Sequence, residues 1–198
     1  MGQYYGCYLQ DASTLREEAF LIVGGAKLTE HSWFENDSVN YIANRLYERS
    51  CITAWVGDYA MDCDPPCPDL IYAQIHDETG HPVELRHDHN TGHMLVNECD
   101  AGEIYPFNMH DRFLVNHTKR EYVDCEAFYR SMLGKSCLGE EWVMHPLPLL
   151  TAIGNGQGGG DYYGVNNDKI GCWALDIISI EETAPSDYER KDFEFYEK

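Results

Sequence analysis

Residues 145–163 read HPLPLLTAIGNGQGGGDYY, an apolar run that passes directly into a cluster of glycines. Pro146 and Pro148 lack a backbone N–H and clash with the preceding turn inside a helix, so we expect 142–153 to be extended, with this part at a sheet edge. The glycines that follow favour a tight turn, because glycine adopts positive φ without steric cost. Beyond this turn, 172–180 is apolar on both faces and predicts a central strand.

Two helices are predicted where a capping residue precedes apolar residues three or four apart. The first begins near Asp37, and its apolar face consists of Val39, Ile42, Ala43 and Leu46. The second spans 126–133, between Asp124 as its cap and Gly134 as its terminator.

Strands are expected at 3–9, 20–23 and 51–56, with a long strand or a bent pair of strands at 112–123 and a single helical turn at 15–19. The charged and aromatic residues 185–198 predict no particular element. Together these segments predict an α+β fold, a mostly antiparallel sheet with two short helices.

The length of 198 residues suits one domain, residues 1–198, which would bury roughly 70% of the surface that its unfolded chain exposes. Residues 61–111 are acidic and rich in histidine and cysteine, and Gly, Pro and Asn interrupt them repeatedly. We expect a loop-rich elaboration of the domain there, with short strands at 70–76 and 93–96.

The net charge of -20, from 34 acidic and 14 basic residues, counts against nucleic acid as a partner, because binding to its phosphates needs clustered Lys and Arg. An acidic surface fits metal cations, a basic protein partner or solubility alone. An acidic DNA mimic, which occupies the site of a nucleic acid, is a special case of the second.

The glycine cluster contains a formal G-x-G-x-x-G at Gly154, Gly156 and Gly159. A dinucleotide site needs a helix after these glycines, and 161–168 predicts none; the Lys-Ser or Lys-Thr of a phosphate loop is also missing. The remaining hypothesis is a loop whose backbone N–H groups bind a ligand beside carboxylates, and the alternative is a plain turn or close strand packing. The candidate ligand-binding residues are Asn155, Gly156, Gly158, Gly159, Gly160, Asp161 and Asp58.

A candidate zinc site consists of Cys63, Cys67, His87 and His89, with Cys99 as an alternative ligand, because zinc prefers tetrahedral sets of Cys and His. Such a zinc ion would stabilise the loop-rich region, and the alternative is histidines on solvated loops. No hydrolase or metalloprotease motif is present, so no catalytic residue is assigned. His117 and His145 lie in apolar stretches and are expected to be structural histidines.

The N-terminus has no basic stretch followed by an apolar core, and no apolar run approaches the roughly 20 residues that span a bilayer. We therefore expect a soluble, cytoplasmic protein without a membrane partner. Its eight cysteines show no repeated spacing, which favours buried, reduced thiols.

Five blocks carry a resemblance: KLTEHSW (27–33), WVGDYA (55–60), LVNHTKREY (114–122), HPLPLLTA (145–152) and GQGGGDY (156–162). They resemble a group of small uncharacterised proteins of bacterial and phage genomes. The resemblance covers about half of the chain. It implies a single-domain intracellular protein of a mobile element and assigns no catalytic residue.

The function expected from these observations is that of a non-catalytic, acidic binding protein, encoded by a phage or mobile element, that engages a basic host protein. One alternative is a binder of a small, nucleotide-like ligand, or a hydrolase, that uses the loop 154–161 with nearby aspartates. The other is a module in which zinc is purely structural.

Overall fold

A computed structural model describes residues 4–22, 26–57, 60, 84–88, 93–96, 103–104, 107–135, 142–154 and 168–195. The elements in chain order are β1 (Tyr5–Asp11), β2 (Glu17–Ile22), α1 (Leu28–His31), α2 (Asp37–Glu48), β3 (Cys51–Gly57), β4 (Glu84–Asp88), β5 (His93–Val96), β6 (Glu103–Ile104), β7 (Phe113–Asn116), β8 (Glu121–Asp124), α3 (Cys125–Met132), α4 (Pro146–Leu150), β9 (Ala152–Ile153), β10 (Ile177–Glu181) and β11 (Glu189–Arg190).

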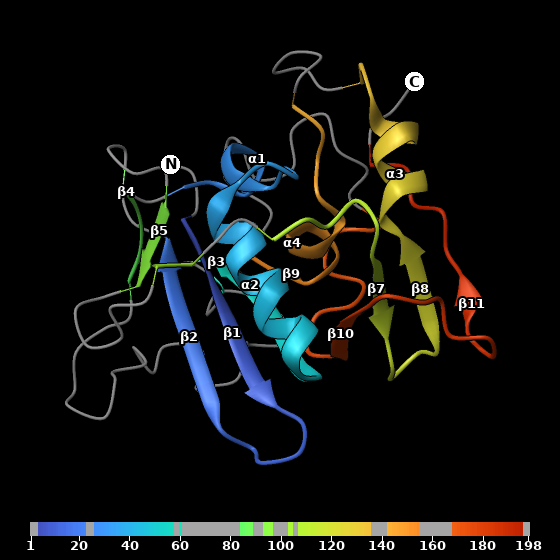
Figure 1. Ribbon diagram of the computed structural model, residues 1–198, viewed down its shortest axis with the longest axis horizontal. Coiled ribbons are helices and arrows are strands. Elements are labelled where there is room, and N and C mark those ends of the chain that lie inside the picture. The colour runs from blue at the N-terminus through green and yellow to red at the C-terminus, as the bar shows by residue number, and fades with distance from the viewer. Residues whose placement is uncertain are drawn as a thin grey trace.

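All described strands belong to one mixed sheet in the order β11-β8-β7-β10-β3-β1-β2-β4-β5-β6, and β9 pairs with β3 beside this path (Figure 1). Its parallel pairs among the described strands are β11 with β8, β2 with β4 and β3 with β9, and the other pairs are antiparallel. The predicted α+β fold with a mostly antiparallel sheet is therefore confirmed.

Strand β3 lies at the centre of the sheet and has partners along both edges. One edge pairs with β1 over its whole length, from Tyr5 opposite Gly57 to Asp11 opposite Cys51. The other edge is divided: β10 pairs with its first residues, Ile177 opposite Ile52, and β9 pairs with its last ones. The strand expected at 51–56 is thus the centre of the fold.

Helix α2 begins where the sequence predicts. The side chain of Asn36 accepts a hydrogen bond from the N–H of Val39, which caps the helix. The predicted apolar face, consisting of Val39, Ile42, Ala43 and Leu46, is buried in the main core. The predicted second helix is α3, where Asp124 accepts from the N–H of Ala127.

The segment around Pro146 and Pro148 is not extended, and this prediction was wrong. It forms the short helix α4, with Pro146 as its first residue. The N–H groups of a first helical turn have no partner within the helix, so two prolines there remove no hydrogen bond. Leu147 lies between them, and its N–H donates to Nδ1 of His145 at 3.0 Å.

The strand predicted for 172–180 is shorter than expected, because 168–175 forms turns and β10 begins only at Ile177. These turns supply the donors that complete α4: the N–H groups of Gly171 and Trp173 donate to the carbonyls of Leu149 and Leu150. The expected central position of this strand is confirmed, since β10 lies between β7 and β3.

Residues 112–123 form a bent pair of strands, the hairpin of β7 and β8, which is one of the two predicted arrangements. The helical turn expected at 15–19 was wrong, since Glu17 begins β2 and pairs with Gln10 of β1. Within the elaboration, the strand expected at 93–96 is β5, whereas 70–76 lies outside the described residues.

No helix in the described part of the chain has both the length and the apolar character that crossing a membrane requires.

Candidate functional site

The predicted ligand-binding residues lie outside the part of the chain that the structure describes. These are Asn155, Gly156, Gly158, Gly159, Gly160, Asp161 and Asp58. The candidate zinc ligands Cys63, Cys67, His89 and Cys99 also lie outside it. His87 belongs to β4, where it pairs with Met94 of β5. Within the described ranges, no three His, Cys, Asp or Glu side chains are grouped so that they could hold a metal ion.

The described chain ends on either side of residues 155–167 are held close to the centre of the sheet. The first end follows β9, which pairs with β3. The second end returns through Gly171, which adopts a φ of +72°. A Cβ atom at Gly171 would lie 2.3 Å from the carbonyl oxygen of Ala152, so the backbones of both ends approach too closely for any side chain.

The richest polar arrangement among the described residues is the hairpin segment 116–121, which joins β7 to β8. Asn116 is buried; its Nδ2 donates to Oδ2 of Asp176 at 2.8 Å and its Oδ1 accepts from the N–H of Lys119 at 2.9 Å. The ammonium group of Lys119 lies 3.1 Å from the same Asp176 oxygen and also donates to the carbonyl of Cys172. Thr118 accepts from the N–H of Ile177. This segment therefore fixes the turn before β10.

His117 lies in a chain of hydrogen bonds that crosses from the hairpin segment to β10. Its Nδ1 is 3.1 Å from the hydroxyl of Tyr188, and its Nε2 is 2.8 Å from Oγ of Ser179. Ser179 is 2% exposed, and its Oγ donates to Glu181 at 2.7 Å.

The positions of the protons in this chain of hydrogen bonds follow from the acceptor at its end, the carboxylate of Glu181. A carboxylate only accepts, so Ser179 gives its single proton to Glu181. Nε2 of His117 must then donate to Ser179, and Nδ1 accepts from Tyr188. A nucleophilic serine needs the opposite direction, in which the serine donates to the histidine. This arrangement is therefore that of a structural bridge.

Two further histidines are fully buried and structural. His31 donates from Nδ1 to the carbonyl of Lys27 at 2.7 Å, and its Nε2 accepts from Nε1 of Trp55 at 2.6 Å. Burial lowers the pKa of His31 to about 4 and that of His145 to about 3. His145 caps α4, and its Nε2 has no hydrogen-bond partner among the residues that the structure describes. The expectation that His117 and His145 are structural agrees with these contacts.

The described cysteines are free thiols, and three of them, Cys7, Cys51 and Cys125, are buried. Burial raises the pKa of Cys51 to about 11 and that of Cys125 to about 12, and it also raises the pKa of Cys7. Cys172 is half-buried, and burial again raises its thiol pKa. A thiol with a raised pKa carries little thiolate at neutral pH, so these groups are poor nucleophiles.

Within the hairpin segment, sequence reasoning assigned a role to His117 alone, as a structural histidine, although the segment lies within the block LVNHTKREY. Its partners, Asp176, Ser179 and Tyr188, lie about 60 to 70 residues further along the chain. Spacing within the block carries no signal for contacts of this kind. Its run of six polar residues in succession, Asn116 to Glu121, was the available indication.

The chain matches no family model, and the comparisons with curated proteins and with solved structures gave no match either.

Proposed function

We propose that this chain is a non-catalytic, acidic binding protein that engages a basic protein partner. The observation that carries the proposal is the exposed acidic surface of the C-terminal part of the chain. Glu182, Asp187, Glu189 and Asp192 have side chains that are 59%, 65%, 70% and 80% exposed, and Glu194 is exposed as well.

The basic side chains of the same region pair with these carboxylates and offset only part of their charge, because 181–195 holds six acidic and two basic residues. Arg190 lies 3.1 Å from Asp192, and Lys191 lies 2.8 Å from Glu189. Elsewhere, Arg45 and Arg49 both contact Glu18. Local pairing leaves the overall excess of 34 acidic over 14 basic residues as a negative field, which attracts cationic partners and steers their approach.

The direction of the hydrogen bonds around Ser179 and the raised pKa values of the buried thiols support a non-catalytic role. The resemblance to small bacterial and phage proteins adds that the partner would be a protein of the host cell. Lys and Arg side chains on that partner would pair with the exposed carboxylates, and the interface would bury little surface area.

The test compares two triple variants of equal charge. In the first, Glu182→Gln, Asp192→Asn and Glu194→Gln remove three exposed carboxylates of the C-terminal part. In the matched control, Glu35→Gln, Asp111→Asn and Asp168→Asn remove three exposed carboxylates elsewhere. The probe is a fluorescent lysine-rich peptide of about 20 residues, titrated at two salt concentrations and followed by anisotropy.

We expect the first variant to lose about tenfold in affinity and the control less than about threefold, with binding that weakens as salt rises. Equal losses in both variants would show that only net charge attracts the peptide, and the assignment to the C-terminal surface would be wrong. An affinity for the peptide that is the same at both salt concentrations would contradict the electrostatic basis of the proposal.

A further inference from the structure

The C-terminal segment (187–195) contacts the rest of the molecule in the way a bound linear peptide contacts its receptor. We propose that its receiving surface, formed by β8, α3, Trp173 and the hairpin segment, is a peptide-recognition site that also takes the C-terminal segment of a second copy. Reciprocal binding would give a dimer with exchanged segments. This inference does not depend on the proposed basic partner.

Backbone pairing supplies the first set of contacts. Strand β11 adds to the edge of the sheet beside β8, with Glu189 opposite Glu121 and Arg190 opposite Tyr122. The N–H of Glu189 donates to the carbonyl of Arg120 at 2.9 Å, and the N–H of Lys191 donates to that of Tyr122 at 2.8 Å. An extended peptide that joins a free sheet edge uses the same hydrogen bonds.

Alternate aromatic side chains supply the second set. Phe195 is fully buried, and its ring centroid is 5.8 Å from that of Phe128 of α3. Phe193 packs edge-to-face against Trp173 at 5.6 Å. Glu194 lies between the two phenylalanines and is exposed, as the alternation of an extended segment requires.

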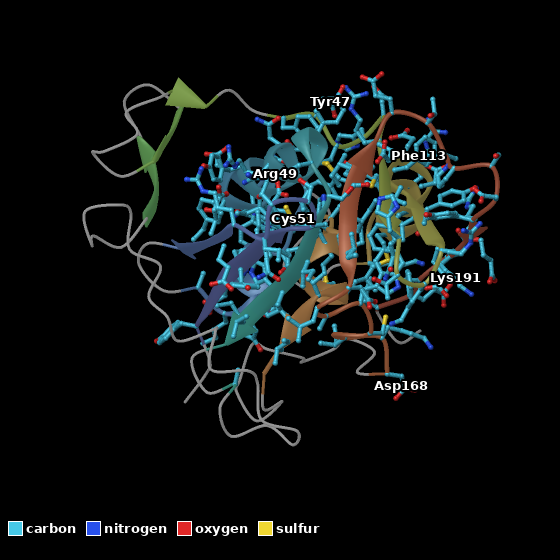
Figure 2. All side chains as sticks on the ribbon, turned by 90° about the horizontal axis from the view of Figure 1, so that it is seen from below. Tyr47, Arg49, Cys51, Phe113, Asp168 and Lys191 are labelled. Carbon is cyan, nitrogen blue, oxygen red and sulfur yellow. The ribbon has the colours of Figure 1, made fainter. Side chains whose placement is uncertain are left out.

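Polar contacts fix the register of the segment. The hydroxyl of Tyr188 donates to His117, and Asp187 pairs with Arg120, whose guanidinium lies 4.9 Å from the centroid of the Tyr188 ring. Lys191 lies 3.3 Å from Glu121, which in turn accepts from Nε1 of Trp173. These contacts distinguish this segment from other chains that carry two phenylalanines. Figure 2 shows Lys191 at the side of the molecule formed by β7 and β8, far from Arg49 and Cys51.

Among the described residues, the linker 182–186 is the part whose path would differ between a closed monomer and an exchanged dimer. Strands β10 and β11 are parallel, with β7 and β8 between them, and Glu189 is level with Ile178 in the register of the sheet. The linker must therefore cross about 14 Å and return about 10 Å along the strands, a direct distance of roughly 17 Å. All other contacts are the same in either arrangement.

Short linkers give the attached segment an effective concentration on the order of millimolar, so the closed monomer dominates at micromolar concentrations. Exchange should become dominant when the linker can no longer span the sheet. Deleting 183–186 leaves four steps between the Cα atoms of Glu181 and Glu189, which reach about 14 Å at full extension. That is shorter than the roughly 17 Å required.

The main experiment measures the mass in solution of the deletion variant by light scattering. We expect a dimer at micromolar concentrations, and a monomer for the control in which 183–186 is replaced by Gly-Ser-Gly-Ser. Adding Phe195→Ala to the deletion variant should return it to a monomer. A monomeric deletion variant, or a dimer that survives Phe195→Ala, would overturn the proposal.

A second measurement keeps the proposal testable if the deletion prevents folding. A fluorescent peptide with the sequence of 187–195 is titrated against the full-length wild type and the full-length Phe195→Ala variant. Binding to the variant should be at least about tenfold tighter, because its own segment no longer fills the receiving surface. A peptide with both Phe193 and Phe195 replaced by alanine should lose this binding. The proposal would be overturned if the Phe195→Ala variant bound the native and the doubly substituted peptides equally well. Absence of saturable binding of the native peptide up to about 1 mM would overturn it as well.

Discussion

Gly171 occupies a position that no other residue fits. Its φ of +72° lies in the left-handed region, and a Cβ atom would meet the carbonyl oxygen of Ala152 at 2.3 Å. That oxygen belongs to backbone, so relief requires a shift of β9, which pairs with β3, or of the turn that carries residue 171. Gly134 offers the contrast, because its φ is +70° and no atom of the described residues lies within 4 Å of its added Cβ.

Gly171→Ala should therefore destabilise the protein far more than Gly134→Ala. The control carries only the cost of the left-handed conformation, about 1 kcal/mol. The collision at Gly171 adds to that cost, and we expect a total of at least about 3 kcal/mol. Urea denaturation of both variants measures the difference. An equal loss in the free energy of unfolding would show that the backbone around Ala152 moves aside without an energetic cost.

Single residues in the left-handed region mark a limit of prediction from this sequence. Leu15, Arg120 and Leu175 have φ values of 59°, 57° and 63°. None is a glycine, asparagine or aspartate, so nothing in their identity indicates the conformation. Each is held by its surroundings: Leu175, for example, donates its N–H to the carbonyl of Thr53.

At the scale of elements, the sequence predicts the helices whose capping residues and apolar faces lie within the element itself. Helix α2 follows from Asn36 and an apolar face, and α3 follows from Asp124. Helix α4 is not predicted by the general rule that proline breaks helices, because that rule does not hold for prolines in the first turn. The polar contacts of the hairpin segment were missed because their partners lie far along the chain, where spacing gives no information.

A buried hydrogen bond from Nε1 of Trp55 to Nε2 of His31 joins helix α1 to the sheet. Protonation of His31 would place two donors against each other at 2.6 Å. Burial lowers its pKa to about 4, against an ordinary value near 6.5. The unfolded chain therefore takes up this proton first as the pH falls.

Stability should decrease as the pH falls from about 6.5 to about 4, by up to about 3 kcal/mol for this group. His145, with a pKa lowered to about 3, contributes in the same direction. His31→Gln removes one of the two groups, so its urea midpoint should depend less on pH over this range. An unchanged dependence would exclude His31 as a source.

At the scale of the whole molecule, charge opposes folding. The net charge of -20 means that the excess carboxylates repel one another in the compact state, and salt screens this repulsion. Ion pairs such as Arg112 with Glu182 are screened as well, but they lie at the surface and contribute little each. Repulsion should therefore dominate the response to salt.

Raising sodium chloride from about 10 mM to about 300 mM should increase the melting temperature by roughly 3 to 6 °C, equivalent to about 1 to 2 kcal/mol. Choline chloride serves as the control and should give a similar rise, because screening depends on ionic strength. A rise with sodium alone would indicate specific ion binding, and a fall would mean that ion pairs outweigh repulsion.

The divided edge of β3 also has a consequence for how the chain is made. Its first partner, β1, has already been synthesised when β3 emerges, whereas β9 and β10 come about 100 and 120 residues later. At about 5 to 20 residues per second, translation needs roughly 6 to 25 s to reach the end of β10. During that time the central strand has an open, apolar edge that neighbouring nascent chains can join. The yield of folded protein in a cell should therefore depend on how fast ribosomes complete the second half of the chain.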